Sequence, residues 1–138
     1  MKTRKLGSNG PELSVIGLGA WAIGGSWRFG WGPSDETESI RTIHRALDLG
    51  INWIDTAPVY GLGRSEEIIG NALSDRRNRV FIATKCGLVW DDNDRVWNDI
   101  SPQSIRREIT ASLKRLNTDV IDLYQIHWPF ANQSETRA

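Results

Sequence analysis

Cysteine and long apolar stretches are the scarcest features of this 138-residue sequence. A single cysteine, Cys86, excludes an intrachain disulfide framework and is typical of a reducing compartment, so a cytoplasmic location is expected. No apolar run approaches the roughly 20 residues that span a bilayer, and the first residues lack the apolar core of a signal peptide. We therefore expect neither a membrane partner nor export.

An excess of charge of either sign is also lacking. The 17 Lys and Arg residues equal the 17 Asp and Glu residues in number, which argues against attraction to nucleic acid or to an anionic membrane. One locally basic stretch, residues 75–79 (DRRNR), lies between a helical pattern and a strand pattern and is predicted to be a solvated loop. No metal site is expected, and length and composition indicate one globular domain.

What the sequence does contain is a regular alternation of short apolar runs and amphipathic patterns. Runs of strand length, rich in Ile, Val, Leu and aromatic residues, occupy residues 14–19, 51–55, 80–84 and 120–126. Between them, apolar residues recur at three- and four-residue steps, which predicts helices over residues 37–49, 66–73 and 102–116. Ahead of the first run, Arg4–Leu6 and Leu13 flank the turn sequence GSNG, a pattern that predicts a small β-hairpin.

Capping residues stand at the expected helix boundaries. Asp35 or Ser34 can cap the first helix, and Gly50 can end it in a left-handed conformation. Ser65, with two glutamates in the turn that follows, is predicted to cap the second helix. Ser101, which is followed by proline, is a typical N-cap for the third helix.

Strands that alternate with helices predict an α/β fold with a parallel sheet and right-handed crossover connections. The predicted order is a hairpin followed by β-α-β-α-β-α-β. The apolar runs are more continuous than alternating, as expected where both faces of a sheet are covered. A doubly wound open sheet and a closed barrel both satisfy this pattern, and periodicity does not decide between them.

Each apolar run ends at a glycine or a polar residue. The first ends at Gly19 and the second at Asp55, while Lys85 follows the third and His127 the fourth. The carboxyl ends of the strands form the active face in parallel α/β folds, so an acid, a cation and an imidazole are predicted to converge there. Tyr60 follows Asp55 by five residues, on the loop after the same strand.

Together these side chains suit proton transfer to a carbonyl oxygen. An aspartate keeps a neighbouring lysine charged and in place, and an ammonium near a tyrosine hydroxyl makes that hydroxyl a better proton donor at neutral pH. A neutral histidine can orient the carbonyl. Each residue also has a structural explanation: Asp55 as a cap or turn residue, Lys85 and His127 as structural side chains, and Tyr60 as an aromatic packed on Trp53. Their occurrence at successive strand ends favours the catalytic interpretation.

Four segments of the sequence resemble the aldo-keto reductases. They are GLGAW at residues 17–21, DTAPVYG at 55–61, ATK at 83–85 and DLYQIHWP at 122–129. The resemblance covers about residues 2–130 and implies a parallel (β/α)8 barrel of the TIM type, of which this chain supplies an N-terminal β-hairpin and about the first four β/α units. Because such a barrel needs about 250 residues, residues 1–138 are interpreted as a single domain, the N-terminal half of a truncated barrel.

The resemblance also implies roles for individual residues. It implies a catalytic tetrad in which Tyr60 is the general acid, aided by Lys85, Asp55 and His127. It implies a nicotinamide cofactor, with NADP(H) favoured over NAD(H), held in part by Gly19, Ala20, Trp21 and Asp55. The substrate pocket is expected to include Trp21, Trp90 and Trp128. The loop over residues 86–100, which also carries Trp97, should wall that pocket; an exposed acidic loop is the alternative interpretation.

The predicted activity is therefore the NAD(P)H-dependent reduction of aldehydes or ketones, with a small carbonyl compound as the partner molecule. Two other functions stay open at this point. One is a catalytically incompetent half barrel that self-associates as a homo-oligomer through its open edges, and the other is a redox-sensing regulatory subunit. The sequence does not name the carbonyl compound.

Overall fold

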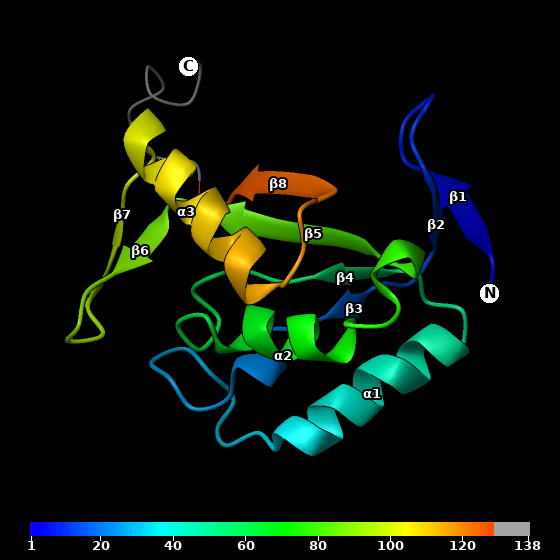
Figure 1. Ribbon diagram of the computed structural model, residues 1–138, viewed down its shortest axis with the longest axis horizontal. Helices are drawn as coiled ribbons and strands as arrows, with labels where there is room; N and C mark the ends of the chain where they lie inside the picture. The colour runs from blue at the N-terminus through cyan, green and yellow to red at the C-terminus, as the bar shows by residue number, and fades with distance from the viewer. Residues whose placement is uncertain (129–138) are drawn as a thin grey trace.

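The computed structural model describes residues 1–128, which form two hairpins and one parallel sheet (Figure 1). The first hairpin pairs β1 (Thr3–Lys5) with β2 (Glu12–Ser14), as predicted. The second pairs β6 (Leu88–Trp90) with β7 (Val96–Asn98), within the segment expected to be a loop. The sheet consists of β3 (Leu18–Gly19), β4 (Trp53–Asp55), β5 (Phe81–Cys86) and β8 (Leu123–Ile126).

The helices of residues 1–128 lie where the periodicity predicts them, to within two residues at each end. They are α1 (Glu36–Asp48), α2 (Arg64–Ala72) and α3 (Pro102–Arg115), with short 3₁₀ helices η1 (Ala22–Gly24) and η2 (Arg77–Arg79). The first predicted strand is wrong, because residues 14–19 are divided between two sheets. Ser14 ends β2, its hydroxyl closes a turn by donating to the Ile16 carbonyl at 2.7 Å, and β3 begins only at Leu18. No helix in this part of the chain is long and apolar enough to cross a bilayer.

The order of the strands separates the two architectures that the sequence left open. The strands follow one another in chain order, β3-β4-β5-β8, and every neighbouring pair is parallel. In a doubly wound sheet the order reverses at a switch point and helices cover both faces. Here all three helices pack on one face (Figure 1). Sequential parallel strands with helices on one side are the arrangement of a barrel wall.

Side chains alternate between the two faces of the sheet, as strand geometry requires. Ile54 and Ile82 point toward the helices, where they pack with Ile43 of α1, Ile69 of α2 and Leu116 after α3, all at most 2% exposed. Burying side chains of this size stabilises the fold by roughly 1.5–3 kcal/mol each. This core fixes the helices against the sheet and holds the carboxyl ends of its strands in place.

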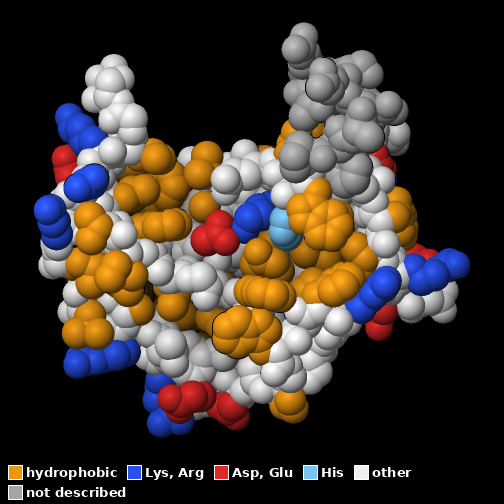
Figure 2. Space-filling view, turned by 180° about the vertical axis from the view of Figure 1, so that it is seen from behind, with side chains coloured by type: hydrophobic (Ala, Val, Ile, Leu, Met, Phe, Trp, Pro, Cys, Tyr) orange, Lys and Arg blue, Asp and Glu red, His pale blue; other side chains and the backbone are white. Residues whose placement is uncertain are grey.

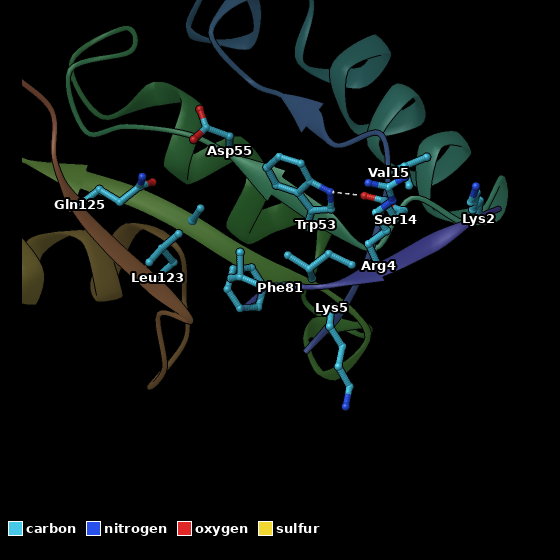
Figure 3. Close-up of a pocket in the computed structure, with 13 residues that line it drawn as sticks. Lys2, Arg4, Lys5, Ser14, Val15, Trp53, Asp55, Phe81, Leu123 and Gln125 are labelled. Atoms are coloured by element: carbon cyan, nitrogen blue, oxygen red, sulfur yellow. Dashed lines mark hydrogen bonds between the residues drawn. The ribbon is translucent and has the colours of Figure 1, made fainter. Parts of the chain in front are cut away.

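The opposite face of the sheet is hollow. Trp53, Phe81 and Leu123 project from it into a concave cavity of about 720 Å³ (Figure 3). The β1–β2 hairpin closes the cavity at the amino ends of the strands, and the Trp53 indole N–H anchors it by donating to the Ser14 carbonyl at 2.9 Å. Asp55 lies at the other end of the same cavity (Figure 3).

The predicted caps are confirmed for two helices and wrong for the third. The Asp35 carboxylate accepts the Glu38 N–H at 2.8 Å, and the Ser101 hydroxyl accepts the Ser104 N–H at 3.2 Å. Gly50 follows α1 with φ of 90°, a left-handed conformation that favours glycine. Ser65 is not a cap, because α2 begins at Arg64 and the Ser65 side chain is fully buried.

The basic stretch over residues 75–79 is also not simply a solvated loop. The Arg77 guanidinium donates to the Val80 and Val120 carbonyls at 2.6 Å and to Asp122 at 2.7 Å. Asp122 in turn accepts the Ile82 backbone N–H at 2.8 Å. Arg77 therefore joins the start of β5, the strand that carries Lys85, to the start of β8, the strand that leads to His127.

Candidate active site

Lys85 is the centre of a polar cluster at the carboxyl end of the sheet. Its ammonium donates to Asp55 Oδ1 at 2.8 Å, to the Thr56 carbonyl at 2.8 Å and to Tyr60 Oη at 3.4 Å. These three acceptors match the three N–H bonds of an ammonium group. The Lys85 side chain is 14% exposed and that of Asp55 is 36% exposed, so the ion pair is sheltered but reachable from solvent. The structure thus brings together three of the four predicted tetrad residues.

Tyr60 is held in place through its backbone. Its carbonyl accepts the Ser65 N–H at 3.1 Å, and η1 packs directly against it. A Cβ atom at Gly24 would lie 2.6 Å from the Tyr60 carbonyl carbon, so only glycine allows this approach. The hydroxyl therefore reaches Lys85 from a fixed loop, and because it accepts the lysine N–H its own proton can point outward.

His127, the fourth predicted residue, stands beside Tyr60. Directly after β8, the backbone N–H of His127 donates to the Cys86 carbonyl at 2.9 Å. The centroid of the His127 ring lies 5.7 Å from that of the Tyr60 ring. Burial and, to a smaller extent, the positive charge of Lys85 together lower the pKa of His127 to about 4, against an opposing contribution from Asp55. The imidazole is therefore neutral at pH 7 and can donate one hydrogen bond.

This neutral state predicts how stability changes with pH. An unfolded histidine titrates near pH 6.5, so between about pH 6.5 and 4 the unfolded chain binds a proton that folded His127 does not. We expect the free energy of unfolding to fall as pH falls through this window and this contribution to be constant above it. Urea unfolding at pH 7 and pH 5 measures the change. His127→Gln should lose less stability than the parent between these two values, and an equal loss in both proteins would contradict the assignment.

A buried hydrogen-bond network supports Lys85 from behind. The Ser65 hydroxyl donates to the Ala20 carbonyl at 3.0 Å and lies 2.9 Å from the Thr56 hydroxyl, with all three residues fully buried. Thr56 also supplies the carbonyl that binds Lys85. Ser65 thus ties the loop after β3 to the loop after β4. The sequence suggested a helix cap at this position because a serine followed by two glutamates looks the same whether the serine caps the helix or is buried in its first turn.

A second cavity, of about 560 Å³, opens beside Tyr60 and His127. On the face shown in Figure 2, an acidic, a basic and a histidine side chain gather at the middle, with hydrophobic side chains around them. The aromatic walls of the second cavity are Trp21, Trp27, Phe29, Trp97 and Trp128. A concave apolar cavity with a few convergent polar groups is typical of a small-molecule site.

The predicted pocket tryptophans are only partly brought together. Trp21 and Trp128 line the cavity, as does Trp97 from β7. Trp90 does not, because its ring lies 5.9 Å from the Arg115 guanidinium of α3. The segment expected to wall the pocket does so as a hairpin. The hairpin is fixed by Glu108, which accepts the Gly87 N–H at 2.9 Å and whose pKa is raised by burial.

The residues expected to contact a cofactor differ in their accessibility. Gly19 and Trp21 are exposed, and the Trp21 ring lies 6.5 Å from the Tyr60 ring. Ala20 between them is fully buried in the main core, and its N–H donates to the Asp55 carbonyl at 2.8 Å. The Ala20 side chain therefore belongs to the core, while the exposed surface of this segment comes from its two neighbours.

Sequence reasoning missed the pocket residues of the segment after η1. Trp27, Arg28 and Phe29 all line the cavity, and Asn98 does so from β7. A signal was present, because the sequence between Trp21 and Trp31 is unusually rich in aromatic residues. Its position after the first parallel strand places it at the active face, which would have been sufficient to include it.

Comparison with known proteins gives consistent matches. A model described as the aldo/keto reductase family matches residues 15–136. The chain is 50% identical over 131 residues to aldo-keto reductase YhdN of Bacillus subtilis, which covers 94% of this chain and 38% of that protein. It is 45% identical over 140 residues to the NADH-specific methylglyoxal reductase of Escherichia coli, which covers 93% and 42%.

Solved structures agree with the topology described above. The glycerol dehydrogenase AKR11B4 of Gluconobacter oxydans superposes with a TM-score of 0.80 at 50% identity, covering 95% of this chain and 40% of that one. An aldo-keto reductase of Klebsiella pneumoniae in complex with NADPH gives 0.69 at 28% identity, covering 86% and 37%. The chain therefore spans about two fifths of the length of the proteins that it matches.

Proposed function

Since the chain belongs to the aldo/keto reductase family, we propose that it carries the proton-donating centre of a nicotinamide-dependent carbonyl reductase. The observation that carries the proposal is the Lys85 ammonium, which binds Asp55 and Tyr60 at the same time. Lys85 comes from β5, whereas Asp55 and Tyr60 belong to the end of β4 and the loop after it. A purely structural role would not require a tyrosine hydroxyl to lie at the edge of an open pocket.

In the proposed reaction, Tyr60 gives its hydroxyl proton to the carbonyl oxygen as the carbonyl carbon is reduced. Lys85 stabilises the phenolate that remains, because its ammonium already donates to Tyr60 Oη. Asp55 holds the ammonium in position. Neutral His127 donates a ring N–H to the same carbonyl oxygen and thereby orients it toward Tyr60.

The residues around Lys85 fit a nicotinamide nucleotide. Within residues 1–128, Asp55 engages Lys85 through Oδ1, and its partly exposed carboxylate leaves Oδ2 free to accept a hydrogen bond from a ribose hydroxyl. Trp21, 42% exposed, offers a flat ring close to Tyr60. When bound, the reduced nicotinamide supplies the hydride. We favour NADP(H) over NAD(H). The Klebsiella relative, at 28% identity, was solved with NADPH, whereas the Escherichia coli relative, at 45% identity, is named NADH-specific, so the test below uses both cofactors.

A cytoplasmic location completes the proposal. Cys86, the single cysteine of the sequence, is 3% exposed at the end of β5. Burial and, to a smaller extent, the nearby Glu108 carboxylate together raise its pKa to about 11, against an opposing contribution from the neighbouring Tyr124 side chain. The thiol therefore stays protonated at neutral pH, and a protein built in this way is suited to a reducing compartment.

The proposal is tested by following the loss of NADPH and of NADH absorbance with the purified protein and a panel of aldehydes and ketones. We expect oxidation that depends on the carbonyl compound, with a higher kcat/KM for NADPH than for NADH. Reactions without carbonyl compound control for slow decay of the cofactor. If neither cofactor is oxidised with any compound of the panel, the protein is not a reductase in this form.

A further inference from the structure

We propose that the cavity beside Tyr60 takes carbonyl compounds that combine an aromatic ring with a carboxylate, and that Arg28 recognises the carboxylate. The inference rests on the proposed function, because it assigns a substrate class to the same site. It is carried by three features of the cavity, namely its aromatic walls, its single formal charge and the position of that charge.

The walls of the cavity form flat aromatic surfaces. Trp27 and Phe29 pack edge to face with centroids 5.4 Å apart, and His127 and Trp128 do the same at 6.1 Å. Phe29, Trp97 and Trp128 remain 45–52% exposed. Large aromatic surfaces left open around a cavity mark a binding site. They fit a planar ligand, since each aromatic contact is worth about 0.5–1.5 kcal/mol beyond the area that it buries.

The charge of the cavity is positive. Among the described residues that line it, Arg28 alone carries a formal charge at neutral pH, because His127 is neutral there. No carboxylate lines the cavity within residues 1–128, since Asp55 belongs to the neighbouring concave cavity. An anionic ligand is therefore attracted by the site and a cationic one is repelled.

Arg28 is positioned to act on a ligand. Its guanidinium carbon lies 5.0 Å from the centroid of the Phe29 ring, a cation–π contact that orients the group at the cavity wall. Within residues 1–128 it forms no ion pair, whereas Arg77, Arg95 and Arg115 each bind a carboxylate. A guanidinium presents paired N–H groups that match a carboxylate in a bidentate geometry. The carbonyl group would then lie toward Tyr60 and the carboxylate toward Arg28, both of which line the cavity.

Binding can be measured without turnover, using the indole N–H signals of the seven tryptophans in two-dimensional proton–nitrogen spectra. The probes are para-carboxybenzaldehyde and its methyl ester, which has the same ring and aldehyde but no charge. We expect the acid to bind roughly 12- to 150-fold more tightly, the range of a hydrogen bond to a charged group. The signals of Trp97 and Trp128 should shift, and those of Trp53 and Trp90 should not, because the latter two lie outside the cavity.

Arg28→Gln should reduce the preference for the acid to near parity and leave the affinity for the ester unchanged. Arg106→Gln, which removes the same charge from an exposed position on α3, is the matched control and should keep the preference. Equal affinities for acid and ester in the parent protein, or an unchanged preference in Arg28→Gln, would overturn the assignment. Binding of the acid without its reduction would refute the proposed function alone, and reduction without a preference would refute only the substrate class.

Discussion

Replacing Tyr60 by phenylalanine is expected to lower kcat by about 10²–10⁴-fold, the usual contribution of a general acid. The change removes the one hydroxyl that lies 3.4 Å from the Lys85 ammonium. The ring and its packing near Trp21 and His127 are kept, so the shape of the cavity should be unchanged. The loss should therefore appear in kcat, with a smaller effect on KM.

The sequence offers a matched control for this substitution, because its only other tyrosine is Tyr124. Tyr124 lies in β8, and its buried hydroxyl has no hydrogen-bond partner within residues 1–128. Tyr124→Phe removes the same atom from outside the site and should leave kcat within a factor of two or so of the parent value. A kcat that is unchanged in Tyr60→Phe would exclude Tyr60 as the proton donor.

The largest effect on stability is expected at Glu66. This glutamate of α2 is fully buried and accepts hydrogen bonds from Arg115 Nε at 2.8 Å and from the Thr84 hydroxyl at 2.6 Å. Glu66→Ala would leave Arg115, which is 17% exposed, without its partner. Removing one member of a buried ion pair costs about 3–5 kcal/mol. Because Thr84 precedes Lys85 on β5, the same change should also loosen the strand that carries the site.

Urea unfolding followed by tryptophan fluorescence measures this loss. The control is Glu38→Ala, which breaks the ion pair between Glu38 and Arg41. The two side chains of this pair are 66% and 69% exposed. An exposed pair of this kind contributes about 0.3–0.5 kcal/mol. The loss in free energy of unfolding should therefore be several-fold larger for Glu66→Ala than for Glu38→Ala. The double variant Glu66→Met with Arg115→Met should recover much of the stability, since it leaves no buried charge. A loss at Glu66 no greater than that at Glu38 would show that the buried pair is not important for stability.

Local patterns in the sequence were sufficient for the three helices, the first hairpin and the three polar residues at strand ends, but not for the β6–β7 hairpin or for the start of β3. The helices follow from apolar spacing, and the Asp35 and Ser101 caps follow from side chains that bond within three residues of themselves. Asp55, Lys85 and His127 could be selected because parallel strands bring their carboxyl ends to one face whatever their exact register. The resemblance to a family added roles that spacing alone does not provide.

The functions of Ser65, Arg77 and the pocket aromatics were decided only by the tertiary structure. Ser65 bonds to a carbonyl 45 residues away and Arg77 to a carboxylate 45 residues away, and neither partner can be found from local sequence. Trp97 rather than Trp90 reaches the pocket because of how the β6–β7 hairpin packs against Arg115 and Glu108 of α3.

The sequence by itself therefore determined where the helices form, in what order they alternate with strands, and which polar groups end the strands, because these depend on neighbours within one turn or one strand. The tertiary structure alone decided whether the sheet resembles a barrel wall, which side chains line the cavity, and that Arg28 is the one charge on its lining within residues 1–128. These features depend on strand order and on contacts between segments distant in sequence, and periodicity carries no information about either.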